Sequence, residues 1–290
     1  MGVTMTKVSQ LIAGALLCLA AVPASAQVHT YVSGKGADTG GCATPATACR
    51  TFAFAIARTT TSGTIIAIDP ANYGPVTITK SISIVADGAG PAGIFINAGT
   101  AIDINVGAND VVNLRGLTLD GAGTASEGIS STAVSSLEPP RRSVTITDCF
   151  IRHFNGTGIF LALGKFLISN TVSSDNMGAG LSIGFNSTAV VDHFTASGDN
   201  MGITMGSRSA PTDVTIVDSV MANNASDGLV LTSLPSNNTH ARLAGSVVTK
   251  NGIGVNTGAG SVGSYGDNEI NGNGTDIQAF PGTFTTLAKR

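Results

Sequence analysis

The apolar and polar positions of this 290-residue chain repeat with a long period. A glycine followed by an aliphatic residue returns every 22 to 26 positions, at Gly158-Ile159, Gly180-Leu181, Gly202-Ile203, Gly228-Leu229 and Gly254-Val255. Around these pairs, apolar and polar residues alternate over short stretches, without the 3.6-residue spacing of an amphipathic helix. A repeat of this length that consists of short strands predicts a β-solenoid.

Polar residues follow the same repeat between the predicted strands. One expected column contains Asp148, Asn170, Asp192, Asp218 and Gly245. Asp, Asn and Gly tolerate the left-handed conformation that a sharp bend requires. Three strands and three bends in about 22 residues make one coil of a parallel β-helix, in which like residues stack at ~4.8 Å.

Departures from the repeat predict insertions and covered ends. The first three repeats are expected to keep a 22-residue step, and insertions are expected at Ser135–Arg142, Ser207–Asp213 and Ser233–His240. Thr51–Thr61 has apolar residues at helical spacing and is predicted to be an N-terminal capping helix. Ala279–Arg290 is predicted to cover the other end, because an open coil exposes unpaired strand edges.

The first residues have the pattern of an export signal. Lys7 precedes an apolar run, Leu11–Val22, and then Ala24-Ser25-Ala26, which predicts a signal peptide at 1–26 and a mature chain from Gln27. The run is shorter than the ~20 residues that span a bilayer, and no second apolar run follows. We therefore expect a secreted or periplasmic protein with no membrane span.

Composition and cysteines narrow the expected partners. Removing Lys7 leaves 18 acidic and 14 basic residues, an acidic balance that argues against nucleic acid. The chain has no Trp and three Tyr, which disfavours a site that stacks sugars on aromatic rings. Cys42 and Cys49 are predicted to form a local disulfide; a metal site is the alternative, but no His is adjacent.

Several stretches resemble the N-terminal entry of exported right-handed parallel β-helix proteins of the pectin-lyase-like superfamily: Tyr31-Val32-Ser33, Gly36-Ala37-Asp38, Phe52–Arg58, Gly63-Thr64-Ile65 and Ser81–Ile84. Tyr265–Gly274 resembles their last repeat. The resemblance implies an all-β, single-stranded right-handed parallel β-helix at 64–278. An entry segment with the capping helix at 27–63 precedes it, and a cap or tail at 279–290 follows.

The superfamily includes pectate lyases, polygalacturonases, epimerases, tailspikes and adhesins, so the resemblance leaves function open. Polygalacturonase-like members carry an Asn-Thr-Asp strand, a paired Asp-Asp and a His-Gly, which this chain lacks. A catalytic hypothesis instead uses Arg152, His153 and Asp175. The predicted register places His153 beside Asp175, which would orient it as a base, while Arg152 would bind an acidic substrate or abstract a proton. The alternative is a solvated polar ladder, His153, Asp175, Ser197, Asn223 and Lys250.

Two further sets of charged residues are candidates. Asp192 and Asp218 are expected to stack one coil apart, where like charges need exposure or a bridging cation such as calcium; as bend formers they need no ion. Arg115, Arg141, Arg142 and Lys165 form a locally basic region that could meet an acidic glycan. Chance variation of the surface is the alternative.

Two functions follow from these candidates. The first is a non-catalytic exported β-helix protein that binds a polysaccharide or cell-surface glycan, or is structural, and requires no cofactor. The alternative is a polysaccharide lyase or related carbohydrate-active enzyme acting on an acidic glycan, with calcium as the metal. The sequence leaves open whether the protein is an enzyme.

Overall fold

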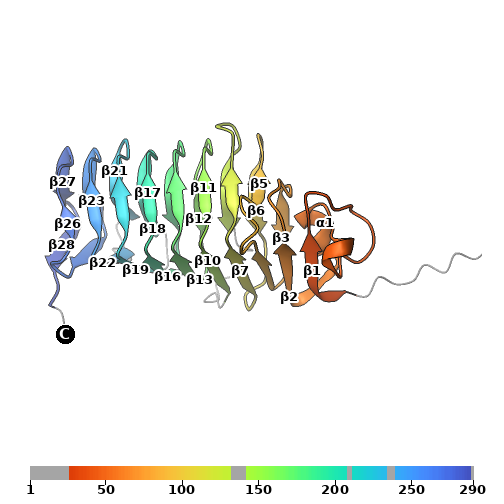
Figure 1. The fold of residues 1–290 in the computed structure, drawn as a ribbon. Helices are drawn as coiled ribbons and strands as arrows, with labels where there is room; N and C mark the ends of the chain where they lie inside the picture. Colours follow the sequence, from red (N-terminus) through yellow and green to blue (C-terminus); the bar gives the residue numbers. More distant parts are fainter. Residues whose placement is uncertain (1–25, 132–141, 208–210, 234–238, 289–290) are drawn as a thin grey trace, which may run out of the picture.

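The computed structural model describes residues 26–131, 142–207, 211–233 and 239–288. In these residues the chain winds into a solenoid whose strands form three parallel sheets, here called sheets A, B and C (Figure 1). From β4 to β27, each coil passes through A, then B, then C. Residues 1–25 of the predicted signal peptide and Arg141 lie outside the described residues.

The sheets are built from short strands in regular order. Sheet A contains β1 (Gln27–Val32), β2 (Thr59–Ala67), β4 (Ile82–Val85), β7 (Val111–Arg115), β10 (Ser143–Thr147), β13 (Lys165–Ser169), β16 (Ser187–Asp192), β19 (Thr212–Val217), β22 (Thr239–Ala244), β25 (Ser261–Ser264) and β28 (Thr283–Thr286). Sheet B contains β5 (Gly93–Phe95), β8 (Thr118–Asp120), β11 (Phe150–Arg152), β14 (Val172–Ser174), β17 (Thr195–Ser197), β20 (Val220–Ala222), β23 (Val247–Thr249) and β26 (Glu269–Ile270). Sheet C contains β3 (Val76–Ile78), β6 (Thr100–Ile104), β9 (Glu127–Ser131), β12 (Ile159–Leu161), β15 (Ala179–Ile183), β18 (Met201–Ser207), β21 (Asp227–Ser233), β24 (Ile253–Asn256) and β27 (Thr275–Gln278).

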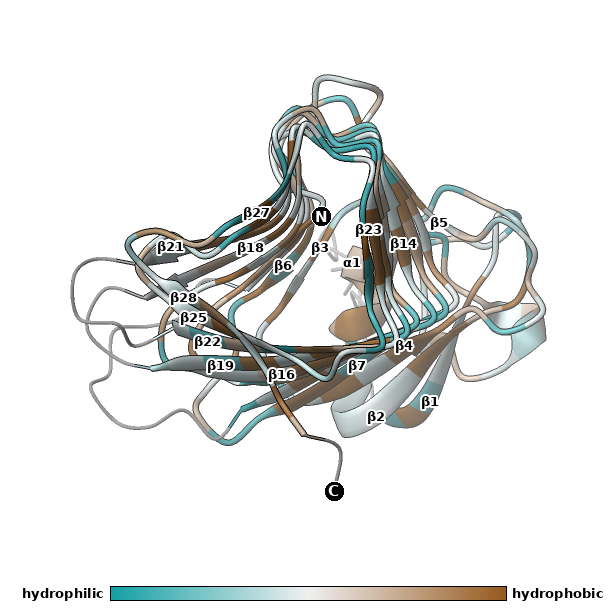
Figure 2. Ribbon diagram, turned by 90° about the vertical axis from the view of Figure 1, so that its left-hand side faces the viewer, coloured by the Kyte–Doolittle hydropathy of each residue, from teal (hydrophilic) through white to brown (hydrophobic). Residues whose placement is uncertain are grey.

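The core is a set of aliphatic columns enclosed by the three sheets. Figure 2 shows the three sheets viewed along the solenoid axis. In sheet C the aliphatic member of each glycine–aliphatic pair lies in register with its equivalents on the neighbouring coils. All five are fully buried: Ile159, Leu181, Ile203, Leu229 and Val255. Burial of each such side chain contributes ~1.5–3 kcal/mol to folding. The repeat detected in the sequence therefore corresponds to a column of stacked core residues.

The first residue of each pair is glycine because the neighbouring coil packs directly against it and leaves no room for a side chain. A Cβ at Gly202 would lie 2.4 Å from the main-chain oxygen of Gly228 and 2.9 Å from Nδ2 of Asn224. Gly228 and Gly254 are crowded in the same way by the side-chain amides of Asn251 and Asn273. None of the five has a positive φ, so close approach rather than bend conformation requires glycine.

The predicted capping helix is shorter than Thr51–Thr61. Helix α1 covers Phe52–Ile56, with the hydroxyl of Thr51 accepting the Phe54 N–H at 3.1 Å. It lies at the N-terminal end of the solenoid (Figure 1), and the Phe52 ring lies 4.9 Å from that of Tyr73. The helix stops early because Thr59 already begins β2, which pairs with β1.

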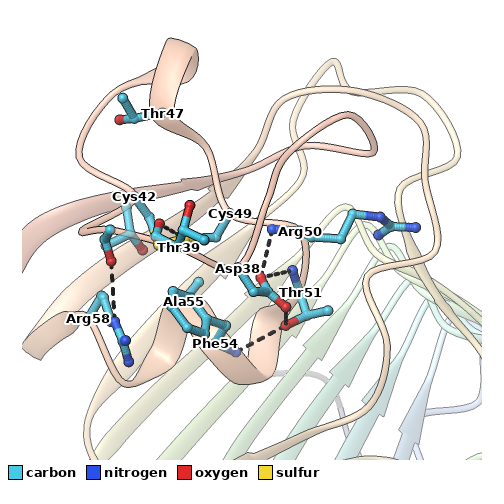
Figure 3. Close-up of a disulfide and its surroundings, with 12 residues drawn as sticks. Asp38, Thr39, Cys42, Thr47, Cys49, Arg50, Thr51, Phe54, Ala55 and Arg58 are labelled. Atoms are coloured by element: carbon cyan, nitrogen blue, oxygen red, sulfur yellow. Dashed lines mark hydrogen bonds between the residues drawn. A yellow bond between two sulfur atoms is a disulfide. The ribbon is translucent and has the colours of Figure 1, made fainter.

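A disulfide joins Cys42 and Cys49, with their Cα atoms 5.2 Å apart, in the loop beside α1 (Figure 3). The carboxylate of Asp38 accepts the main-chain N–H groups of Arg50 and Thr51 and the Thr51 hydroxyl. These bonds tie the loop to the start of the helix. Cys149 is the free cysteine of the described residues; it is buried, and burial raises its pKa to about 12.

The C-terminal segment extends the solenoid. Within the predicted cap at 279–290, β28 pairs with β25 as a further strand of sheet A. Side chains at this end are exposed, with 84% of Phe280 open to solvent. Among the described residues, no helix has the length and apolar character needed to cross a membrane.

The predicted register is wrong by a single position in sheets A and B of one coil. Ile146 pairs with Ile168 at the predicted step, but Ile168 pairs with Val191 rather than with Val190. Leu161 pairs with Ile183 and Lys165 pairs with Thr188. The extra residue therefore lies between Ile183 and Thr188, since that stretch is one residue longer than the stretch from Leu161 to Lys165. The spacing of the glycine–aliphatic pairs does not reveal this extra residue, because Leu181 still pairs with Ile203 at the regular 22-residue step in sheet C.

Candidate functional site

The most concentrated charged cluster on sheet B consists of Asp120, Arg152 and His153. Asp120 and Arg152 end the neighbouring strands β8 and β11 and lie in register. Arg152 Nε donates to Asp120 Oδ2 at 2.9 Å, and Nδ1 of His153 lies 3.3 Å from both Asp120 oxygens. One carboxylate therefore holds a guanidinium and an imidazole.

Asp120 is ionised in this setting. Burial alone raises the pKa of Asp120, but hydrogen bonds from the Ala122 main chain, Arg152 and His153 outweigh it, so this pKa lies below its usual value. The Asp120 side chain is 16% exposed, against 38% for Arg152 and 43% for His153. The carboxylate is thus shielded by two groups that reach solvent.

Asp175 does not take the predicted role beside His153. It follows β14 on the next coil, at the equivalent bend position, and both residues have φ 56°. Its carboxylate is directed along the solenoid away from His153, since a Cβ on Gly198 of the coil beyond would lie 2.5 Å from Asp175 Oδ1. Gly198, rather than Ser197, is also the next member of this bend column, because Ser197 pairs with Ser174.

Asp120 is the site residue that the repeat pattern does not reveal. It is separated from Arg152 by more than one regular step, because the insertion at Ser135–Arg142 lengthens this coil. Aligning the short strand Thr118–Asp120 with Phe150–Arg152 across that insertion would find it.

A second cluster lies at the bend between sheets A and B. Three possible ligand atoms, one each from Asp192, His193 and Asp218, lie within 4.8 Å of one another. The predicted stacking of Asp192 on Asp218 is wrong: Asp192 pairs with Val217, while His193 and Asp218 occupy the bend position with φ 49° and 46°. The carboxylates meet diagonally across the coils.

The donor set of this cluster suits some ions better than others. Calcium takes six to eight oxygen ligands, whereas mixed imidazole and carboxylate sets suit zinc and other first-row transition ions. Nδ1 of His193 is also 2.6 Å from Asp192 Oδ1, so a metal would compete with that contact. The cluster fits calcium only with most ligands supplied by water or by a bound molecule.

The predicted basic region is largely neutralised or buried. Arg115 Nε lies 3.1 Å from both Asp87 Oδ1 and Asp148 Oδ2. Arg142 is 2% exposed and donates to the main-chain oxygens of Leu163 and Ala162. Burial lowers the pKa of Arg142. Arg142 therefore ties the chain together where it enters sheet A and does not face a ligand.

Lys165 is the exception within the basic set. It is exposed at the start of β13 and forms no ion pair with the described residues. It borders a hollow of about 280 Å³ whose lining includes Thr188, Pro211 and Asp213. A hollow of about 350 Å³ lies elsewhere, between α1 and β3. Neither is lined by Arg152 or His153.

Comparison with known proteins identifies the fold. No protein-family model and no curated protein sequence matches this chain. Among solved structures, pectate lyase Pel9A is similar with a TM-score of 0.64 and 17% identity over 91% of this chain and 77% of its own. The A-module of the mannuronan C-5 epimerase AlgE6 of Azotobacter vinelandii is similar with a TM-score of 0.58 and 19% identity, over 73% of this chain and 62% of its own.

These similarities define the class of protein. The chain is a right-handed parallel β-helix of the architecture found in pectate lyase and mannuronan epimerase, as the sequence resemblance implies. At identities this low the similarity extends to fold and not to individual residues.

Proposed function

We propose that this chain is an exported, non-catalytic β-helix protein that binds an acidic polysaccharide or a glycan-covered surface. The observation that carries the proposal is the shared carboxylate of Asp120, which engages both Arg152 and His153. Arg152 and His153, the side chains that the catalytic hypothesis uses for proton transfer, are both bound to Asp120 of the same chain.

The chemistry of this cluster disfavours proton abstraction by Arg152. A base must be unprotonated and within reach of the proton that it removes. The Nε–H of Arg152 is already used as a donor to the carboxylate of Asp120. Arg115 is compensated in the same way by two aspartates, so both arginines already share their charge with carboxylates of this chain.

Binding of carbohydrate is supported by the fold and by the surface. The similar structures are named for pectate and mannuronan, which are polymers of acidic sugars. The long sheets offer an extended face, and Lys165 is an exposed cation available to a sugar carboxylate. Calcium held near Asp192 and Asp218 could bridge to the polymer without being needed for folding.

A panel of uronic-acid polysaccharides and neutral glycans, assayed with and without calcium, tests the proposal. We expect retention on at least one acidic polymer in affinity electrophoresis, with no ultraviolet-absorbing unsaturated product, no new reducing ends and no change in the polymer's ¹H NMR spectrum. Product formation by the purified protein would overturn the non-catalytic part. Absence of binding across the panel would overturn the binding part.

A lyase or related enzyme is the second candidate, and the contact between Asp120 and His153 favours it. A carboxylate beside an imidazole can orient the ring as a general base. If product appears, loss of activity in both His153→Ala and Asp120→Asn, with binding retained, would assign the chemistry to this pair. Activity unchanged in both variants would place it elsewhere.

A further inference from the structure

A ladder of side chains runs inside the bend between sheets B and C. On successive coils the residue after the positive-φ position is Asn176, Asp199, Asn224, Asn251 and Asn273. From Asp199 to Asn273, each Oδ1 accepts the main-chain N–H of the ladder residue on the preceding coil, at 2.8 to 3.1 Å. The first four are 2–4% exposed.

The side-chain amide of each of these asparagines donates hydrogen bonds to oxygen atoms of the neighbouring coils. Nδ2 of Asn224 donates to Asn251 Oδ1 at 2.9 Å and to the main-chain oxygen of Ala196 at 3.3 Å. Nδ2 of Asn251 donates in the same way to Asn273 Oδ1 and to the Met221 oxygen, each at 2.9 Å. The position of Nδ2 therefore requires a hydrogen-bond donor on each coil.

Asp199 places an oxygen at that position. Its Oδ1 accepts both the N–H and the side-chain amide of Asn176, at 2.8 and 2.9 Å. Its Oδ2 is buried, has no hydrogen-bond partner among the described residues, and lies 2.5 Å from where a Cβ on Gly180 would be. A carboxylate would present an acceptor where the neighbouring coils present a donor, and an unpaired buried charge is costly. A carboxylic acid supplies the missing O–H donor.

The strands packed around this bend supply no cation that would stabilise a carboxylate. Among the described residues, no titratable side chain is found in the five neighbouring strands, which are β14, β15, β17, β18 and β20. The charged group facing this bend is Asp175, whose like charge disfavours ionisation. Burial raises the pKa of Asp199 to about 7, with a further increase from Asp175, although the hydrogen bonds from Asn176 oppose the shift.

We propose that Asp199 is held as a neutral carboxylic acid whose Oδ2–H takes the place of an asparagine amide, which makes this coil a pH-sensitive joint of the solenoid. At low pH the acid completes the ladder. Loss of its proton leaves a buried anion whose Oδ2 receives no hydrogen bond from the described residues, and this loosens the contact between the two halves of the solenoid.

The direction of the pH dependence follows from linkage. An unfolded aspartate ionises near pH ~3.9, whereas folded Asp199 ionises at about 7. Between these values the folded state binds one more proton than the unfolded state, so stability falls as the pH rises. A shift of this size corresponds to a change of up to about a thousandfold in the unfolding equilibrium constant, fully present below pH ~4 and lost above pH ~7.

The test compares Asp199→Asn with the wild type in denaturant unfolding from pH 4 to pH 8. The variant restores the amide, so we expect its stability relative to the wild type to increase across this range, up to about a thousandfold in the unfolding constant. Other carboxylates titrate equally in both proteins and cancel in the difference. Parallel pH profiles would overturn the proposal.

Two further measurements keep the test independent of how one variant folds. In wild-type protein labelled with ¹³C at the Asp carboxyls, the resonance that is absent in Asp199→Asn should titrate near pH 7; a midpoint near 4 would overturn the proposal. Asn224→Asp places a second acid in the ladder, and we expect an additional loss of stability with rising pH. An unchanged profile for that variant would contradict the donor requirement.

Discussion

Arg152 and Asp120 are joined at 2.9 Å across neighbouring coils of sheet B, and this contact organises the charged surface around them. His153 follows Arg152 in the chain and contacts the same carboxylate. The pair is possible because β8 and β11 lie in register although they are far apart in the sequence.

Asp120→Asn should destabilise the fold by ~1–3 kcal/mol, because it removes two charge-assisted contacts from a largely shielded carboxylate. Denaturant unfolding at pH 7 measures this. Since the pKa of Asp120 is lowered by folding, its contribution is present above pH ~3.9 and is lost as the pH falls further.

Asp87→Asn is the matched control, because it removes one partner of Arg115 in an ion pair whose side chains are 53% and 52% exposed. Exposed pairs contribute ~0–1 kcal/mol. An equal loss in the two variants would show that burial of Asp120 has no energetic consequence.

Gly202→Ala should destabilise the solenoid by at least ~1–3 kcal/mol, as overpacking does elsewhere. The added Cβ would lie 2.4 Å from the main-chain oxygen of Gly228, which cannot move without separating two coils. Gly41→Ala is the control, since a Cβ there meets nothing within 4 Å and the residue has no positive φ. Thermal unfolding of both variants measures the difference; equal midpoints would mean that the glycine repeat has no packing role.

The fold can be predicted from the sequence because each coil repeats one pattern. The aliphatic residue after each glycine marks a buried position in sheet C, and those positions do stack in register. The stretch from Ile183 to Thr188 is one residue longer than the stretch between their partners, Leu161 and Lys165. The pattern in sheet C does not record this extra residue. The repeat therefore assigns the bend position to Asp192 instead of His193.

Side-chain partners are harder to predict than backbone columns. The sequence predicts that Arg142 faces a ligand, yet it is buried against main-chain oxygens where the chain enters sheet A. Arg142 is the last residue of the stretch Ser135–Arg142, which departs from the repeat, so the repeat pattern cannot indicate where its side chain lies. Asp120 escapes prediction for the related reason that an insertion separates it from its partners.

Lys165→Ala and Arg142→Ala should separate binding from stability. Lys165 is exposed and unpaired among the described residues, so its removal should leave the unfolding midpoint unchanged and weaken retention on an acidic polymer. Arg142→Ala should cost ~1–3 kcal/mol, because it leaves buried main-chain acceptors without a donor. Lys165→Arg, which keeps the charge, should retain binding. Retention unaffected in Lys165→Ala would remove this residue from the binding surface.

The cluster of Asp192, His193 and Asp218 makes a prediction about metal selectivity. Its three ligand atoms include one imidazole nitrogen, so zinc should bind more tightly than calcium if an ion occupies it. Isothermal titration with each metal measures the order, and His193→Ala should lower zinc affinity while leaving calcium binding almost unchanged. Asp218→Asn should weaken both, because each ion needs the carboxylates. Calcium binding that exceeds zinc binding, and that depends on Asp192 and Asp218 but not on His193, would mean that the imidazole stays hydrogen-bonded to Asp192 and that the carboxylates alone hold the ion.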